Sequence, residues 1–268
     1  MENTYTKFNN LTGWIVFAIA TIVYIMTLEP TASFWDCGEF IATAYKLEVG
    51  HPPGAPLWLM ISRVFALFAG DTVENVAYAI NVFSALSSSF TILFLFWSVT
   101  HMAKKMVTRN GKRELLGGDS LAIMAAGTIG SLAYAFSDSF WFSAVEGEVY
   151  AASSLFTAVV FWLVLKWERV ADEQGSDRYL IFIAYLMGLS IGVHLLNLLV
   201  IPPIALVYYF RKHEPTLKGG IIAFIIGFIA LVIIQYGIIQ QVVKIASKFE
   251  WVFVNSFGLP KHLVCYSS

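Results

Sequence analysis

The sequence predicts an all-α integral membrane protein, a bundle of about seven transmembrane helices with interfacial helices in the first external loop. Three features of the composition support this class. The 268 residues are 58% hydrophobic and only 13% charged, about half the charged fraction of a soluble domain, and the mean hydropathy is +0.70. The net charge of -1 offers no concentrated basic face, so we expect no nucleic-acid partner.

Apolar segments predict the spans, because a helix needs roughly 20 mostly apolar residues to cross a bilayer. The first segment ends at Glu29-Pro30 and lacks the small-residue cleavage pattern of a signal peptide, so we expect a retained anchor. The tail at 261–268 has no helix-ending signal and suggests truncation. The predicted order is a polar N-terminus at 1–12, an external loop at 29–75, and spans near 13–28, 76–102, 120–136, 149–165, 179–193, 195–210 and 219–240, all within a module of residues 13–260.

Two segments need a choice between topologies. Residues 179–210 would form a helix of about 48 Å, too long for a hydrocarbon core of about 30 Å, so we expect two short spans that turn at 194–197. Residues 57–69 are only 13 long and carry Arg63 near their centre. This pattern is typical of an interfacial or re-entrant helix rather than a span.

The basic residues support both choices. With this topology, the loops at 104–113, 166–178 and 211–218 share one side and hold five, three and three Lys or Arg residues. The positive-inside rule then places the N-terminus in the cytoplasm. The first loop, the loop at 137–148 and the turn at 194–197 then face the non-cytoplasmic side.

The segment Phe34-Trp35-Asp36-Cys37-Gly38-Glu39-Phe40 follows the first span and is the strongest candidate for chemistry. A carboxylate held at headgroup depth by aromatic neighbours can be partly desolvated and act as a general base. If a helix begins near Ser33 or Asp36, Asp36 and Glu39 share one face. The alternative is that both acids are solvated in the first turn of an interfacial helix.

Next comes His51-Pro52-Pro53-Gly54-Ala55-Pro56-Leu57, a stiff turn that excludes helix. It either presents His51 to a pocket or merely connects two interfacial helices.

Cys37 and Cys265 show neither a disulfide framework nor metal-ligand spacing. The sequence also lacks the P-loop, GxSxG, HExxH and paired CxxC motifs, so it gives no support for soluble-type nucleotide, serine-hydrolase or zinc chemistry.

A second external loop holds Glu146, Glu148 and Tyr150 with no counter-charge. Placing acidic side chains near the hydrocarbon edge costs free energy unless they pair, bind a cation or face a water-filled cavity. Two residues apart, the two glutamates cannot share a helical face, so a helical turn would point at most one of them inward. The alternative is a simple charged helix cap.

The last candidates are His194 and Asn197 at the predicted outer turn, followed by Pro202-Pro203. The polar pair could bind a phosphate or a sugar, or it could satisfy backbone carbonyls of the turn. The double proline breaks the backbone ladder of the sixth span and predicts a kink or an irregular helix.

Four motifs in this order resemble the GT-C glycosyltransferases, and in particular a bacterial domain-of-unknown-function family related to transmembrane protein O-mannosyltransferases. The motifs are 34–40, 51–57, Ala144-Val145-Glu146-Gly147-Glu148-Val149-Tyr150 and Gly192-Val193-His194-Leu195-Leu196-Asn197. The resemblance covers residues 10–260 and implies a GT-C-like bundle in a bacterial inner membrane, with the active site on the periplasmic face. Family members continue through more spans and a large soluble region, so this chain looks like an N-terminal catalytic module.

The resemblance implies transfer of a sugar, with mannose as one candidate, from a polyprenyl-phosphate carrier to an acceptor hydroxyl of a protein or glycan. Asp36 looks like the base that removes the acceptor proton, with Glu39 beside it. His51, His194 or Arg63 could neutralise the leaving phosphate. The remaining candidates for substrate binding are Glu146, Glu148, Tyr150 and Asn197.

Two other functions remain open from the residues alone. A transporter or lipid flippase would use broken helices and charge within its spans, but the spans hold almost no charge. A membrane scaffold would leave the acids scattered and solvated.

No cofactor is required by any motif. Asp36 and Glu39 could hold Mg²⁺ or Mn²⁺ through oxygen ligands, although two acids make an incomplete shell.

Overall fold

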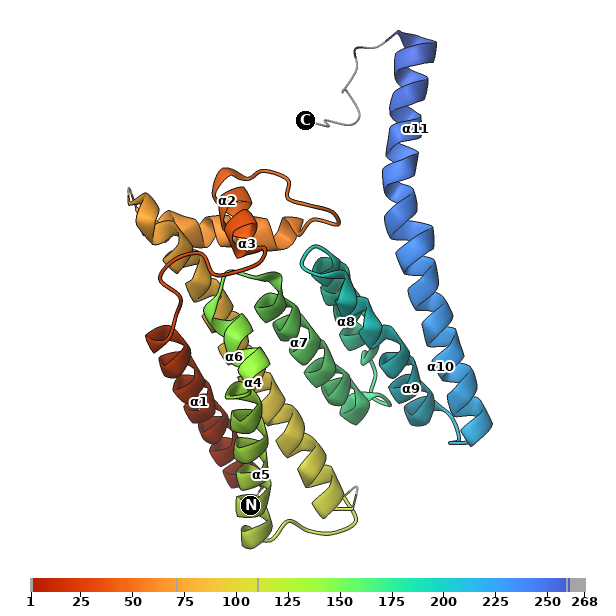
Figure 1. Ribbon diagram of the computed structural model, residues 1–268. Helices are drawn as coiled ribbons and strands as arrows, with labels where there is room; N and C mark the ends of the chain where they lie inside the picture. Colours follow the sequence, from red (N-terminus) through yellow and green to blue (C-terminus); the bar gives the residue numbers. More distant parts are fainter. Residues whose placement is uncertain (1, 71, 110, 259, 261–268) are drawn as a thin grey trace. The chain divides into compact units, whose positions relative to one another are not determined.

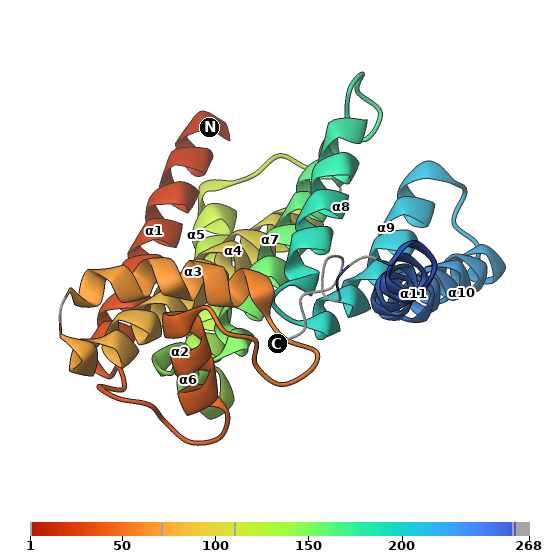
Figure 2. The same ribbon diagram turned by 90° about the horizontal axis from the view of Figure 1, so that it is seen from above.

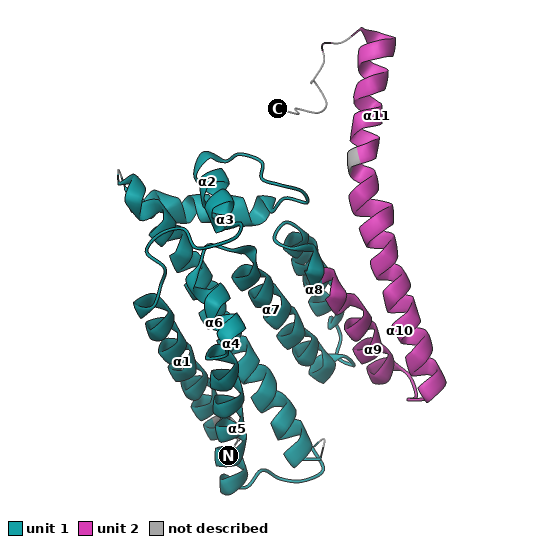
Figure 3. Ribbon diagram, viewed as in Figure 1, with its two compact units in different colours: residues 1–197 teal, residues 198–268 magenta. Residues whose placement is uncertain are grey.

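The computed structural model describes the chain except residues 1, 71, 110, 259 and 261–268. The predicted tail and Cys265 therefore lie outside the described residues. Every regular element in the described part is a helix, which confirms the all-α class (Figure 1). The chain forms two compact units, residues 1–197 and 198–268 (Figure 3).

The first unit is built around one long helix. Helix α4 (Val76–Val107) packs against α1 (Glu2–Met26), α5 (Gly117–Ala135), α6 (Asp138–Val145) and α7 (Val149–Val170). Small side chains line its buried faces, among them Ser84, Ser87, Ser88, Ser89, Thr91, Ser98 and Thr100. Such residues let neighbouring helices approach closely, which is how helices associate in lipid. Helix α8 (Asp177–Ile191) packs against α7.

Two short helices lie across one end of this bundle. They are α2 (Cys37–Lys46) and α3 (Pro56–Ala66), which pack against each other and against α4 (Figures 1 and 2). Short 3-10 turns, Leu67–Ala69 and Val73–Asn75, lead from α3 into α4. Trp58, Ile80 and Phe83 form the core beneath these two helices. Residues 57–69 thus form a short helical segment across the bundle end, and the interfacial position of this segment stays a prediction.

A close backbone contact holds α3 in place. The N–H groups of Leu57 and Trp58 donate to the carbonyl of Gly192, at 2.8 and 3.3 Å. A side chain at Gly192 would place its Cβ 2.9 Å from the Cβ of Leu57, so this position requires glycine. The contact ties the first loop to the end of α8.

The described helices include five that are long and apolar enough to cross a membrane, or six if α5 and α6, bent by 67°, form one broken span. The sequence indicates about seven. The difference lies in α8, whose 15 residues reach only about 22 Å, short of the hydrocarbon core. The helix nevertheless stops near the predicted position, since α8 ends at Ile191 and a 3-10 helix begins at Leu195.

The second unit consists of α9 (Ile201–Lys212), α10 (Leu217–Val232), a π-helix (Ile233–Ile239) and α11 (Gln240–Phe257). The predicted irregularity at Pro202-Pro203 is present, because the 3-10 helix Leu195–Val200 gives way to α9 there. No α-helical ladder is broken, however. Both prolines lie in the first turn of α9, where their missing N–H groups would have had no helical partner.

Candidate active site

The segment that carries Asp36 makes a sharp turn before α2. Trp35 has a φ of 60°, in the left-handed region, an unusual conformation for a bulky residue and one that clusters at functional sites. Phe34 and Trp35 are 79% and 89% exposed. Helix α2 begins at Cys37, directly after Asp36, so Asp36 lies at its N-terminus.

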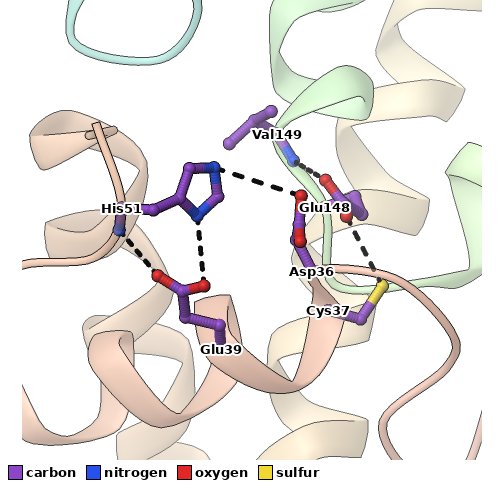
Figure 4. A network of polar contacts seen from close by, with 6 residues as sticks. All are labelled: Asp36, Cys37, Glu39, His51, Glu148 and Val149. Atoms are coloured by element: carbon purple, nitrogen blue, oxygen red, sulfur yellow. Dashed lines mark hydrogen bonds and ion pairs between the residues drawn. The ribbon is translucent and has the colours of Figure 1, made fainter. Parts of the chain in front are cut away.

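Glu39 contacts His51, the residue that the sequence places in a stiff turn and marks as a candidate to face a pocket. One of its carboxylate oxygens accepts from the backbone N–H of His51 at 2.6 Å, and the other lies 3.1 Å from His51 Nδ1. The second ring nitrogen, Nε2, is 4.0 Å from the carboxylate of Asp36 (Figure 4). Asp36 and Glu39 therefore reach the same imidazole from one side of α2, as their spacing predicts.

The contact between Glu39 and His51 favours charge on both groups. Hydrogen bonds from the backbone and ring of His51 lower the pKa of Glu39. The same carboxylate is the main cause of a raised pKa at His51, and Asp36 adds to it. His51 is consequently cationic over a wider pH range than a free histidine, which places a positive charge beside Asp36.

Glu146 and Glu148 are both buried, at 4% and 5% exposure. The expectation that a helical turn would bury at most one does not apply, because α6 ends at Val145 and both glutamates are extended. In extended chain, residues two apart point to the same side. The pair therefore faces inward together.

The buried glutamates resist ionisation. Burial raises the pKa of Glu148 to about 7, and the nearby Glu146 and Asp36 add to the effect. Burial also raises the pKa of Glu146. Glu148 accepts from the N–H of Val149 at 3.3 Å and lies 3.8 Å from Cys37 Sγ (Figure 4). A carboxylate with this pKa can give or take a proton near neutral pH.

We call Asp36, Glu39, His51, Glu146 and Glu148 the acid–histidine cluster. Asp36, Glu39 and His51 each offer a ligand atom, and these atoms lie within 4.8 Å of one another. Mg²⁺ and Mn²⁺ often bind one or two carboxylates together with substrate phosphates and water. The three side chains thus resemble part of a divalent-cation shell that a phosphate-bearing substrate could complete.

Two residues that sequence reasoning missed support this cluster. Cys37 is fully buried beside Glu148, and burial together with the neighbouring carboxylates raises the pKa of its thiol. Asn81, also fully buried, donates to the carbonyls of Glu29 and Thr31, at 2.7 and 3.2 Å. Asn81 lies within the predicted span 76–102. A polar carboxamide inside an apolar span is the sequence feature that could have marked it as a candidate.

The other candidates lie in different surroundings. Arg63 stacks on the ring of Tyr45, 5.0 Å from its centre. His194 and Tyr150 have ring centres 5.5 Å apart, and burial lowers the pKa of His194. A lowered pKa favours neutral imidazole, so His51 is better suited than His194 to neutralise a phosphate.

Asn197 takes part in packing between helices. Its amide oxygen accepts from Ser153 at 2.7 Å and from Thr157 at 3.2 Å, both on α7, and its nitrogen donates to the carbonyl of Ser190 at 3.4 Å. These contacts favour the alternative in which Asn197 satisfies local polar groups.

Comparison with known proteins matches residues 36–217 to the family described as "Protein O-mannosyl-transferase TMEM260 N-terminal domain". The chain belongs to this family. The match begins at Asp36 and includes every candidate site residue through Asn197. The resemblance to transmembrane O-mannosyltransferases inferred from the motifs is therefore confirmed.

Two curated relatives extend this finding. The chain is 26% identical to the protein O-mannosyl-transferase tmem260 of Dictyostelium discoideum over 70% of its own length and 22% of the relative. It is 28% identical to the protein O-mannosyl-transferase TMEM260 of Mus musculus over 76% of its own length and 26% of the relative. The chain thus spans about a quarter of the length of these relatives. No solved structure matches it significantly.

Proposed function

We propose that this chain provides the catalytic membrane module of a glycosyltransferase that moves a sugar from a polyprenyl-phosphate carrier to a Ser or Thr hydroxyl of a protein. The names of both relatives favour mannose as the sugar. The observation that carries the proposal is the acid–histidine cluster, in which Asp36 stands beside a histidine that Glu39 holds at 3.1 Å. Isolated, solvated acids would have favoured a scaffold instead.

In the proposed reaction, the acceptor oxygen attacks C1 of the sugar as Asp36 removes the hydroxyl proton. The bond between C1 and the phosphate oxygen breaks, and the polyprenyl phosphate leaves with that electron pair, inverting the configuration at C1. A hydroxyl is a weak nucleophile until a positioned base takes its proton. Cationic His51 stabilises the negative charge that develops on the leaving phosphate.

The distribution of charge supports a periplasmic site. The basic segments at 104–113 and 166–178 begin in the last turns of α4 and α7. The cluster lies at the opposite end of the same bundle, next to α2 and the start of α7 (Figure 1). By the positive-inside rule, the basic loops are cytoplasmic and the cluster faces away from the cytoplasm.

The test is transfer from a mannosyl polyprenyl phosphate to a Ser/Thr peptide, followed by mass spectrometry, with the full-length protein. Asp36→Asn should lower product formation by about 100-fold or more, the usual contribution of a general base. Glu48→Gln is the matched control, because this exposed acid in the same loop lies 4.0 Å from Lys46. Full activity in a folded Asp36→Asn protein would reject Asp36 as the base, and lipid movement without a peptide product would favour a flippase.

A further inference from the structure

A cavity of about 330 Å³ opens among α1, α4 and α7. Its lining comes from residues 5–14 of α1, 97–104 of α4 and 162–169 of α7. These are the N-terminal turns of α1 and the C-terminal turns of the other two helices, so the cavity lies at the end of the bundle away from the acid–histidine cluster (Figure 1). The proposed transfer reaction makes no use of it.

The lining is basic and aromatic. Lys104, Lys166 and Arg169 contribute positive charge, and the lining residues described include no carboxylate. Lys104 and Lys166 lie over the rings of Tyr5 and Trp162, each 4.8 Å from the ring centre. The rings thus hold two ammonium groups at the wall, an arrangement suited to an anion. Glu168, the acid on this turn of α7, forms an ion pair with Lys105.

Two residues of the lining each have a buried polar atom without a hydrogen-bond partner in the described structure, namely Oδ1 of Asn9 and Nε1 of Trp97. The indole N–H can only donate. Asn9 Oδ1 can only accept, so it would take a hydrogen bond from a hydroxyl group of the ligand. Gly13 leaves room for this indole, because a Cβ there would lie 2.7 Å from Trp97 Nε1. An anion in the cavity would supply the missing acceptor.

We propose that this basic cavity binds a phosphate group, carried either by the headgroup of an anionic phospholipid or by a soluble phosphate compound. Lysine, arginine and buried N–H donors are the groups that recognise phosphate. Basic pockets between transmembrane helices on the cytoplasmic side bind anionic lipid headgroups. The volume of the cavity admits a phosphate with part of its ester.

The experiment uses the full chain purified in detergent. One arm measures retention of phosphatidylglycerol or of phosphate-free diacylglycerol by native mass spectrometry. The other measures the change in Tm on adding inorganic phosphate. Lys166→Gln/Arg169→Gln removes two charges from the lining, and Lys7→Gln/Arg178→Gln is the matched control outside it. Trp97→Phe keeps a ring but removes the N–H, and it tests the site if the double variant does not fold.

We expect wild-type protein to retain phosphatidylglycerol over diacylglycerol, or to be stabilised by inorganic phosphate, with the responding arm identifying the source. The lining double variant should weaken that response about tenfold, and Trp97→Phe about threefold, as expected for a charge-assisted and a neutral hydrogen bond. Equal responses in the lining and control variants, or no preference for phosphate in either arm, would overturn the proposal.

Discussion

The two ends of the unit formed by residues 1–197 carry opposite charge. One end gathers the carboxylates of the acid–histidine cluster around His51. The other gathers Lys104, Lys166 and Arg169 around a cavity walled by tryptophans. At the first end Asp36 and Glu39 lie beside His51, which suits proton transfer. At the second, the indole N–H of Trp97 is left without an acceptor beside these cations, which suits an anionic ligand.

Replacing His51 by Gln should affect the function of the acidic end and leave that of the basic end unchanged. The change removes the cation beside Asp36 and the imidazole that Glu39 holds, so we expect transfer to fall by about 100-fold, as when a preorganised electrostatic group is lost. Phosphate binding at the basic cavity should not change. His213→Gln, in the second unit, is the control. Activity within threefold of wild type would remove His51 from the mechanism.

Glu39→Gln should have a smaller effect, about tenfold on transfer, because Glu39 acts through His51. Glu39 raises the pKa of His51, so the variant should lose the imidazolium at a lower pH than wild type. The loss of activity should therefore be larger at pH 8 than at pH 6. Histidine NMR measures this pKa directly, and an unchanged value would contradict the positioning role of Glu39.

Glu148→Gln should alter the pH dependence of stability. The pKa of Glu148 is raised from 4.5 to about 7 in the folded protein, so the folded state binds the extra proton. Wild type consequently loses stability as pH rises through this window. Gln stays neutral, so the variant should melt at a higher temperature than wild type at pH 8 and at a similar one at pH 4. A parallel shift at both pH values would contradict burial as the cause.

Arg63→Gln should have the smallest effect. Arg63 lies on the ring of Tyr45, so its loss should remove a packing contact and change transfer by less than about threefold. Donor titrations of the full-length protein check this. A large increase in the donor KM would show that Arg63 contacts the carrier phosphate and would extend the site along α3.

The sequence predicted the acidic end better than the basic one. Helical spacing placed Asp36 and Glu39 on one face, and the proline-rich turn marked His51, because both signals are local. The inward orientation of Glu146 and Glu148 was missed because it depends on where α6 ends. The basic cavity was missed because it forms between Asn9, Trp97 and Lys166, on helices far apart in the chain. Their juxtaposition depends on how α1, α4 and α7 pack.

The central claim is that Asp36 acts in the chemical step. Its most direct test is to measure kcat and the dissociation constant of the lipid-linked donor for wild type and Asp36→Asn in the full-length protein. A base removes a proton only as the new bond forms, so kcat should fall by about 100-fold or more while donor affinity stays within about threefold. An unchanged kcat, or a loss explained entirely by weaker donor binding, would contradict the claim.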